Sequence, residues 1–130
     1  MTAGLGLAEV LIKEADEEAS IPPQIAKNAK LTTFVQYCYH KKHHLKRECN
    51  FVFDLEIPEH FTPKTNDGET TDFRRVKLGK NCSLFDQPDD WKPNCFAITL
   101  DFAIRMGQIE SSDLSDLLEW SYLMRNKDLF

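Results

Sequence analysis

The first twenty residues carry apolar and charged side chains with the spacing of an α-helix. Ala, Leu, Glu and Lys, which favour helix, dominate the segment from Leu5 to Ala19, and Pro22-Pro23 prevents the helix from continuing. One ridge of this helix is apolar at its start and acidic at its end, through Leu7, Val10, Leu11, Glu14, Glu17 and Glu18. We therefore expect the three carboxylates to face a cleft at the edge of the core.

The pattern of the remaining chain predicts a hairpin, one further strand and two helices. Alternating aromatic and β-branched residues indicate strands over 31–40 and 49–57, joined by the polar loop 41–47. A third strand is expected over 70–78, and helices over 95–106 and 112–123. These elements predict a mixed α/β fold in a single domain over 1–130. Because only about three strands are available to cover the first helix, the order of elements indicates that the chain begins in the middle of a fold.

Composition and charge narrow the classes of function. With 130 residues and 42% hydrophobic residues, the chain suits one small domain with a true core. A formal charge of -5 argues against a general nucleic-acid or anionic-membrane surface, and no run of about 20 apolar residues is present to span a membrane. The four cysteines form no C-x-x-C pair, and the first residues lack the basic region of a secretory signal. We expect a cytoplasmic protein with reduced thiols.

Glu14, Glu17 and Glu18 are the candidate metal ligands. They lie three and four residues apart, and like charges at this spacing repel by roughly 0.2–0.5 kcal/mol per pair. A hard divalent cation such as Mg²⁺ or Mn²⁺ would turn that repulsion into binding. The alternative is an ordinary solvated acidic face, which is the commoner use of such a stripe.

The same segment resembles part of the Nudix box, G-x5-E-x7-R-E-U-x-E-E-x-G-U, in which U is aliphatic. Residues 13–21 read K-E-A-D-E-E-A-S-I and match its second half, with Lys13 in place of the arginine and Ser20 in place of the glycine. The position of the earlier glutamate in the box falls on Leu5, and the first glycine would lie before Met1.

Two downstream segments, 51–73 and 91–107, resemble one Nudix subgroup, the thiamine pyrophosphokinase-related proteins of fungi and plants. Boxes of that subgroup commonly read K-E-A-x-E-E-A-S, which accommodates Lys13 and Ser20. The subgroup is associated with diphosphates of damaged thiamine, such as oxythiamine and oxothiamine. The resemblance runs from Ala3 to about Gly107, and the chain is similar to the C-terminal part of such a protein from the middle of the box onward.

The resemblance implies a fold, a reaction and roles for particular residues. The fold would be an α/β/α sandwich around a mixed sheet. The reaction would be hydrolysis of a small-molecule diphosphate that is nucleotide-like or thiamine-diphosphate-like, with Glu14, Glu17 and Glu18 holding Mg²⁺ or Mn²⁺. Glu17, Glu18 and Glu69 are the candidate catalytic residues, Glu69 as a further ligand or a base. Lys13 is expected to pair with a neighbouring carboxylate.

A second class of function is a Nudix-like module that does not catalyse a reaction. The incomplete box supports it, and an exposed sheet edge could pair with another chain, so a homo-oligomer is open as well. Other candidates are less specific. His40, His43 and His44 near Cys38 suggest zinc, although a solvated basic loop explains them better. Cys95 is expected to be a buried thiol rather than a nucleophile, and Trp91 is expected either to stack on a heterocycle or to close the domain edge.

Overall fold

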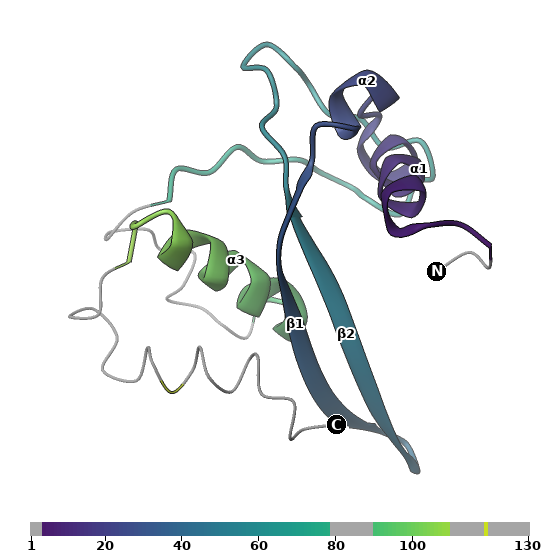
Figure 1. The fold of residues 1–130 in the computed structure, drawn as a ribbon, viewed down its shortest axis with the longest axis vertical. Helices are drawn as coiled ribbons and strands as arrows, with labels where there is room; N and C mark the ends of the chain where they lie inside the picture. The colour runs from purple at the N-terminus through teal and green to yellow at the C-terminus, as the bar shows by residue number, and fades with distance from the viewer. Residues whose placement is uncertain (1–3, 79–89, 110–118, 120–130) are drawn as a thin grey trace. The chain divides into compact units, whose positions relative to one another are not determined.

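The computed structural model describes residues 4–78, 90–109 and 119. Its elements are the helix α1 (Leu7–Ala19), the short helix α2 (Pro23–Ala26), the strands β1 (Lys30–Lys41) and β2 (His44–Asp54), and the helix α3 (Pro93–Arg105), all shown in Figure 1. Helices and an antiparallel two-stranded sheet confirm the predicted α/β class and are consistent with a Nudix-like fold. Among the described residues the sheet consists of β1 and β2 alone, so the mixed sheet of a sandwich stays a prediction.

The chain divides into two compact units. The first unit comprises Met1–Thr32 and Phe53–Arg75, and the second comprises Thr33–Val52 and Val76–Phe130. The first therefore holds α1, α2 and the long loop that follows β2, whereas the second holds most of the hairpin together with α3. The single domain over 1–130 that the sequence indicated stays a prediction.

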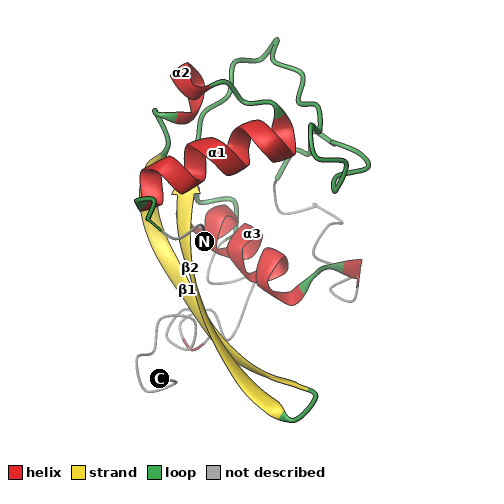
Figure 2. Cartoon of the chain, turned by 90° about the vertical axis from the view of Figure 1, so that its right-hand side faces the viewer, coloured by secondary structure: helices red, strands yellow, loops and turns green. Residues whose placement is uncertain are grey.

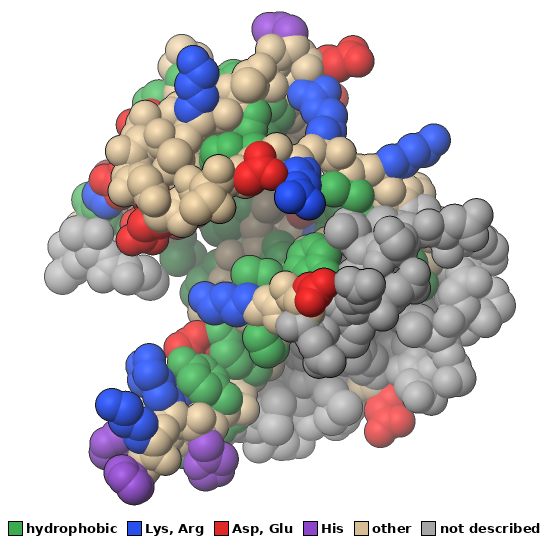
Figure 3. All heavy atoms as spheres, turned by 180° about the vertical axis from the view of Figure 1, so that it is seen from behind, with side chains coloured by type: hydrophobic (Ala, Val, Ile, Leu, Met, Phe, Trp, Pro, Cys, Tyr) green, Lys and Arg blue, Asp and Glu red, His purple; other side chains and the backbone are tan. Residues whose placement is uncertain are grey.

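Two expectations about individual elements need correction. The hairpin loop is not 41–47 but a two-residue turn at Lys42 and His43, and both strands extend to it. Every residue from His40 to Arg47 is exposed, so this part of the hairpin carries no apolar alternation and its polar sequence resembled a loop. Figure 3 shows Lys, Arg and His side chains gathered at this tip. Residues 70–78 form no strand, because none of the described strands pairs with them.

The two predicted helices that lie within the described residues are confirmed. The first helix ends at Ala19 as expected, and α3 begins two residues before the predicted start and ends one residue before the predicted end. The sequence did not predict α2, a single turn that begins at Pro23 with proline in the favourable first position. The predicted helix over 112–123 lies outside the described residues except for Glu119.

In the second unit, one face of the hairpin carries a polar network. The hydroxyl groups of Tyr37 and Tyr39 both donate hydrogen bonds to the carboxylate of Glu48, and their rings stack with centroids 5.9 Å apart. These two hydrogen bonds hold the pKa of Glu48 below its ordinary value. Because the donors come from β1 and the acceptor from β2, the network ties the two strands together.

Candidate metal and diphosphate site

The C-terminal end of α1 is the centre of the candidate site. The residues that follow Ala19 determine where this helix ends. Ser20 follows the helix in the left-handed conformation, with φ of 53°. Its N–H donates to the carbonyl of Asp16, and the N–H of Ile21 reaches back to the carbonyl of Ala15, as in a Schellman cap. The buried side chain of Ile21 then anchors the chain in the core. Ser20 therefore occupies the position, glycine in the Nudix box, at which a left-handed residue closes the helix.

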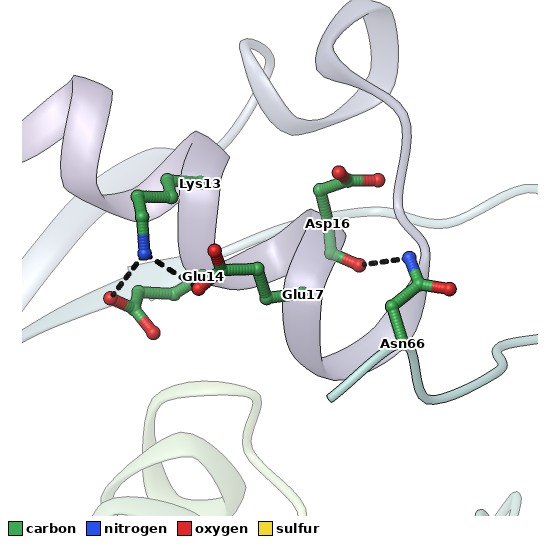
Figure 4. Close-up of polar contacts among 5 residues, drawn as sticks. All are labelled: Lys13, Glu14, Asp16, Glu17 and Asn66. Atoms are coloured by element: carbon green, nitrogen blue, oxygen red, sulfur yellow. Dashed lines mark hydrogen bonds and ion pairs between the residues drawn. The ribbon is translucent and has the colours of Figure 1, made fainter. Parts of the chain in front are cut away.

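Glu14 and Glu17 lie on either side of Lys13 on the exposed face of α1. The Lys13 Nζ atom is 2.6 Å from Oε2 of Glu17 and 3.8 Å from Oε1 of Glu14, as Figure 4 shows. The hydrogen bond to Glu17 raises the pKa of Lys13 above its ordinary value. The expected pairing of Lys13 with a neighbouring carboxylate is thus confirmed. Its ammonium offsets part of the repulsion between the two glutamates.

Glu18 faces a different set of charges, which comes from the loop after β2. Partial loss of water contact is the main cause of a raised Glu18 pKa, and the negative charges of Glu14, Asp67 and Glu69 raise it further. The structure therefore brings Glu69 close enough to the predicted carboxylate face to act on it electrostatically. It also adds Asp67, which the sequence predicted only as part of a turn.

Residues 64–67 hold this loop against the C-terminal end of α1. The N–H groups of Lys64, Asn66 and Asp67 donate to helix carbonyls, the first to Ala19 at 3.2 Å and the other two to Glu17 at 2.9 and 3.2 Å. These carbonyls belong to the last turn, whose C=O groups have no N–H donors within the helix itself. Figure 2 shows the loop passing beside the end of α1.

Two side chains add to the attachment of the loop. Asn66 Nδ2 donates to the Asp16 carbonyl at 2.9 Å, and Ser20 Oγ donates to the Lys64 carbonyl at 2.8 Å (Figure 4 draws the first). The helix end and the loop thus act as one structural piece. Because Glu17 and Glu18 are on the helix and Glu69 is on the loop, this attachment brings the candidate residues together.

Asp67 shapes the turn that leads to Glu69. Its Oδ1 atom accepts hydrogen bonds from Thr65 Oγ1 and from the N–H of Glu69, both at 2.9 Å. The hydrogen bonds lower the pKa of Asp67, the bond from the Glu69 N–H most of all. The N-D-G sequence predicted a turn here, and an aspartate that accepts from the backbone two residues later is a recognised part of such turns. That signal was available in the sequence, although it does not reveal which helix the turn meets.

The described residues hold no ready-made metal cage. No group of three or more His, Cys, Asp or Glu side chains within them is arranged to bind an ion. The donor set still has the chemistry that Mg²⁺ and Mn²⁺ prefer, since every candidate is a carboxylate. The arrangement places Lys13 between two of the candidate ligands, so an ion would have to displace its ammonium or share the carboxylates with it.

The other candidates of the sequence belong to the second unit. Cys95 is exposed, so the expected buried thiol is wrong. His40, His43 and His44 are exposed on the hairpin, where the described residues form no metal-binding group. Trp91 packs edge-to-face against Phe96, with ring centroids 6.0 Å apart, and so covers the first turn of α3. In the part of the chain that is described, no helix has the length and apolar character needed to cross a bilayer.

A pocket of about 870 Å³ lies beside the attached loop, within the first unit. Its walls come from the loop after β2, between Leu55 and Arg75. Lys64 and Thr65 belong both to this wall and to the segment that meets α1. The pocket wall and Glu69 therefore lie on one continuous stretch of chain, because Thr65 and Thr70 on either side of Glu69 both line the pocket.

Comparison with known proteins supports the resemblance of the box. No family model matches the chain. Two relatives from Arabidopsis thaliana are "Nudix hydrolase 20, chloroplastic", 35% identical over 96% of this chain, and "Nudix hydrolase 24, chloroplastic", 32% identical over 88%. Both plant relatives are Nudix hydrolases by name. An uncharacterised protein of Saccharomyces cerevisiae is 30% identical over 88% of the chain.

The chain spans about a third of the length of each of these relatives, 33%, 32% and 36% respectively. The matches support a place among the Nudix hydrolases, whereas the thiamine-related subgroup is not confirmed by them. Both plant names carry the word chloroplastic, so the expected cytoplasmic location gains no support and stays a prediction.

Proposed function

We propose that this chain carries the carboxylate centre of a Nudix-type hydrolase, which cleaves a diphosphate linkage with the help of Mg²⁺ or Mn²⁺. The substrate class is a nucleotide-like or thiamine-diphosphate-like small molecule. The observation that supports the proposal is the attachment of loop 64–67 to the end of α1, because the same loop carries Asp67 and Glu69, whose charges act on Glu18. Hydrolases named for the same family match nearly the whole chain.

The residues divide into metal-holding and proton-handling roles. Glu14, Glu17 and Glu18 would hold the ion, which when bound supplies positive charge to phosphate oxygens and makes a water more acidic. The attacking water adds its oxygen to one phosphorus atom, while the bond from that phosphorus to the bridging oxygen breaks. Glu18 and Glu69 are the candidates for accepting the proton that the water loses, and Glu17 supports the reaction through the ion. Lys13 keeps Glu14 and Glu17 together before the ion binds.

The test is hydrolysis by the 130-residue chain of ADP and of thiamine diphosphate, with Mg²⁺, with Mn²⁺ and with a chelator. We expect turnover only with a metal ion, and the Glu17→Gln variant should lose about 100-fold in kcat because charge stabilisation at the phosphates weakens. Asp16→Asn is the matched control, since it removes a neighbouring carboxylate whose side chain points away from Glu14 and Glu17 in Figure 4. Equal turnover in the Glu17 and Asp16 variants would contradict the proposal.

A non-catalytic Nudix-like module is the second candidate function. It is favoured by the position of Lys13 between Glu14 and Glu17, which already compensates those charges without an ion. Calorimetric titration with Mg²⁺ separates the two. Heat of binding that disappears in a Glu14/Glu17/Glu18→Gln triple variant supports the hydrolase, whereas absence of binding heat in the unmodified chain supports the module. Assembly into a homo-oligomer stays a prediction.

A further inference from the structure

The pocket of the first unit has the size and the lining of a small-molecule site. Its volume of about 870 Å³ is within the range of about 300–1,000 Å³ found for ligand pockets. Leu55, Ile57, Phe61 and Phe73 supply apolar walls. Two of these residues remain unusually open for large apolar side chains, with Ile57 39% and Phe73 37% exposed. A ligand with a flat apolar surface would cover them.

The charges on the wall of the pocket are mainly positive. Arg74 pairs with Asp72 at 2.9 Å, so those two charges compensate one another. Arg75 instead donates to the backbone carbonyls of Glu59 and Phe61, at 2.7 and 3.4 Å. Among the described residues neither the Arg75 guanidinium nor the Lys64 ammonium has a carboxylate partner. This excess of positive charge disfavours a cationic ligand and favours an uncharged or anionic one.

The pocket wall is close to Asp67 and Glu69 along the chain. Thr65 lines the pocket and also donates to Asp67, which shapes the turn to Glu69. Glu69 follows Thr65 by four positions, a span of at most about 14 Å for a fully extended chain. A ligand that is acidic at one end and flat at the other can therefore reach both places at once.

We propose that this pocket binds an uncharged planar ring of a diphosphate ester, stacked against Phe73 and Phe61, while the diphosphate lies at the carboxylates of α1. This inference rests on the proposed function and deepens it, because it assigns the organic part of the substrate to named residues. Lys64 lines the pocket, its N–H donates to the Ala19 carbonyl at the end of α1, and its ammonium provides a positive charge for a phosphate oxygen.

The test compares ligands with and without a ring by calorimetry in Mg²⁺. α,β-methylene-ADP carries an uncharged ring, methylenediphosphonate carries none, and neither is cleaved at the bridge. We expect α,β-methylene-ADP to bind at least about tenfold more tightly than methylenediphosphonate. Phe73→Ala should remove most of this difference in affinity without weakening the binding of methylenediphosphonate. Phe34→Ala is the matched control, since Phe34 is 39% exposed but lies on β1 outside the pocket.

Three outcomes would overturn the pocket assignment. They are equal affinity for the two ligands, an equal loss in the Phe34 and Phe73 variants, and tighter binding of thiamine diphosphate, whose ring nearest the phosphates is cationic. Should Phe73→Ala fail to fold by circular dichroism, Phe73→Leu keeps apolar volume without an aromatic face. An unchanged preference for the ring in that variant would equally count against stacking.

Failure of the pocket and failure of the proposed function give different results. In the proposed hydrolase, Glu17→Gln weakens both ligands alike, since both place their phosphates at the carboxylates. If Glu17→Gln has no effect while the ring still strengthens binding through Phe73, the hydrolase proposal fails and the ring site stands. If Glu17→Gln weakens the binding of both ligands and Phe73→Ala weakens the binding of neither, the pocket assignment fails and the hydrolase proposal stands.

Discussion

At the scale of single residues, Ser20 shows how a side chain can compensate for a strained backbone. A residue other than glycine in the left-handed conformation costs roughly 1–2 kcal/mol. Ser20 adopts that conformation, with φ of 53°, and its Oγ atom donates to the Lys64 carbonyl at 2.8 Å. A net gain of about 0.5–1.5 kcal/mol from one hydrogen bond offsets much of the strain.

Substitutions at Ser20 separate these two contributions. Ser20→Ala keeps the strain and loses the hydrogen bond, so we expect unfolding free energy to fall by about 1 kcal/mol. Ser20→Gly loses the bond but also the strain, so its stability should stay within about 0.5 kcal/mol of the original. Urea denaturation measures both. Identical stabilities for the two variants would show that the conformation of Ser20 carries no strain.

The charge of Glu18 should make stability depend on pH. Its pKa is raised in the folded chain, chiefly by partial desolvation and then by neighbouring carboxylates. The protonated form is therefore favoured by folding, and this contribution is present below the unfolded pKa of about 4.3 and is lost as pH rises through the folded pKa. Glu18→Gln should thus stabilise the chain at pH 7 and have little effect near pH 4. Because the group is exposed, we expect only a fraction of 1 kcal/mol.

Thermal unfolding at the two pH values checks this expectation in metal-free buffer. Glu59→Gln provides a control, since Glu59 is an exposed glutamate in the loop after β2 and is not among the charges that act on Glu18. A stabilising effect of Glu18→Gln that is the same at pH 4 and pH 7 would contradict the charge argument.

At the scale of elements, Asn66 is the side chain that ties the loop to α1. Asn66→Ala removes the 2.9 Å bond to the Asp16 carbonyl and leaves the backbone bonds in place, so we expect a loss of about 1 kcal/mol. With the loop less firmly attached, Asp67 and Glu69 act less on Glu18, and its pKa should move down toward the ordinary value. NMR titration of the side-chain carboxyl groups measures that shift.

Asn28→Ala is the control for a purely structural effect. Asn28 Nδ2 also donates to a backbone carbonyl, that of Gln24 at 3.2 Å, but it lies after α2 and outside the carboxylate group. Both variants should lose stability, yet only Asn66→Ala should move the pKa of Glu18. A shift of equal size in both would show that Asn66 has no special part in placing the loop.

The sequence predicted α1 well because the information for that helix is local. Helix-favouring residues, a proline pair and the serine at the box's glycine position all lie within its own segment, and the spacing of the glutamates follows from helical geometry. The strand over 70–78 failed for the opposite reason, since a strand needs a partner that a single segment cannot specify. The attachment of residues 64–67 to α1 also lay beyond prediction, because it joins residues 44 and 50 positions apart.

At the scale of the whole molecule, the candidate chemistry is confined to one of two units. Glu14, Glu17, Glu18, Glu69 and the pocket all belong to the first unit, whereas α3 and most of the hairpin belong to the second. The second has its own polar contacts, among them the pair of Arg105 with the buried Asp101 at 2.8 Å. Binding of an ion should therefore stabilise the first unit directly.

Hydrogen exchange with and without Mg²⁺ tests this division. An ion present at ten times its dissociation constant stabilises the unit that binds it by about 1.4 kcal/mol. Amide exchange by local opening in that unit should therefore slow about tenfold. We expect protection at the last turn of α1 and at residues 64–69, and little change at residues 33–52 or in α3. Glu17→Gln should abolish the effect. Equal protection of both units would mean that they open together, and protection limited to the second would place the ion away from α1.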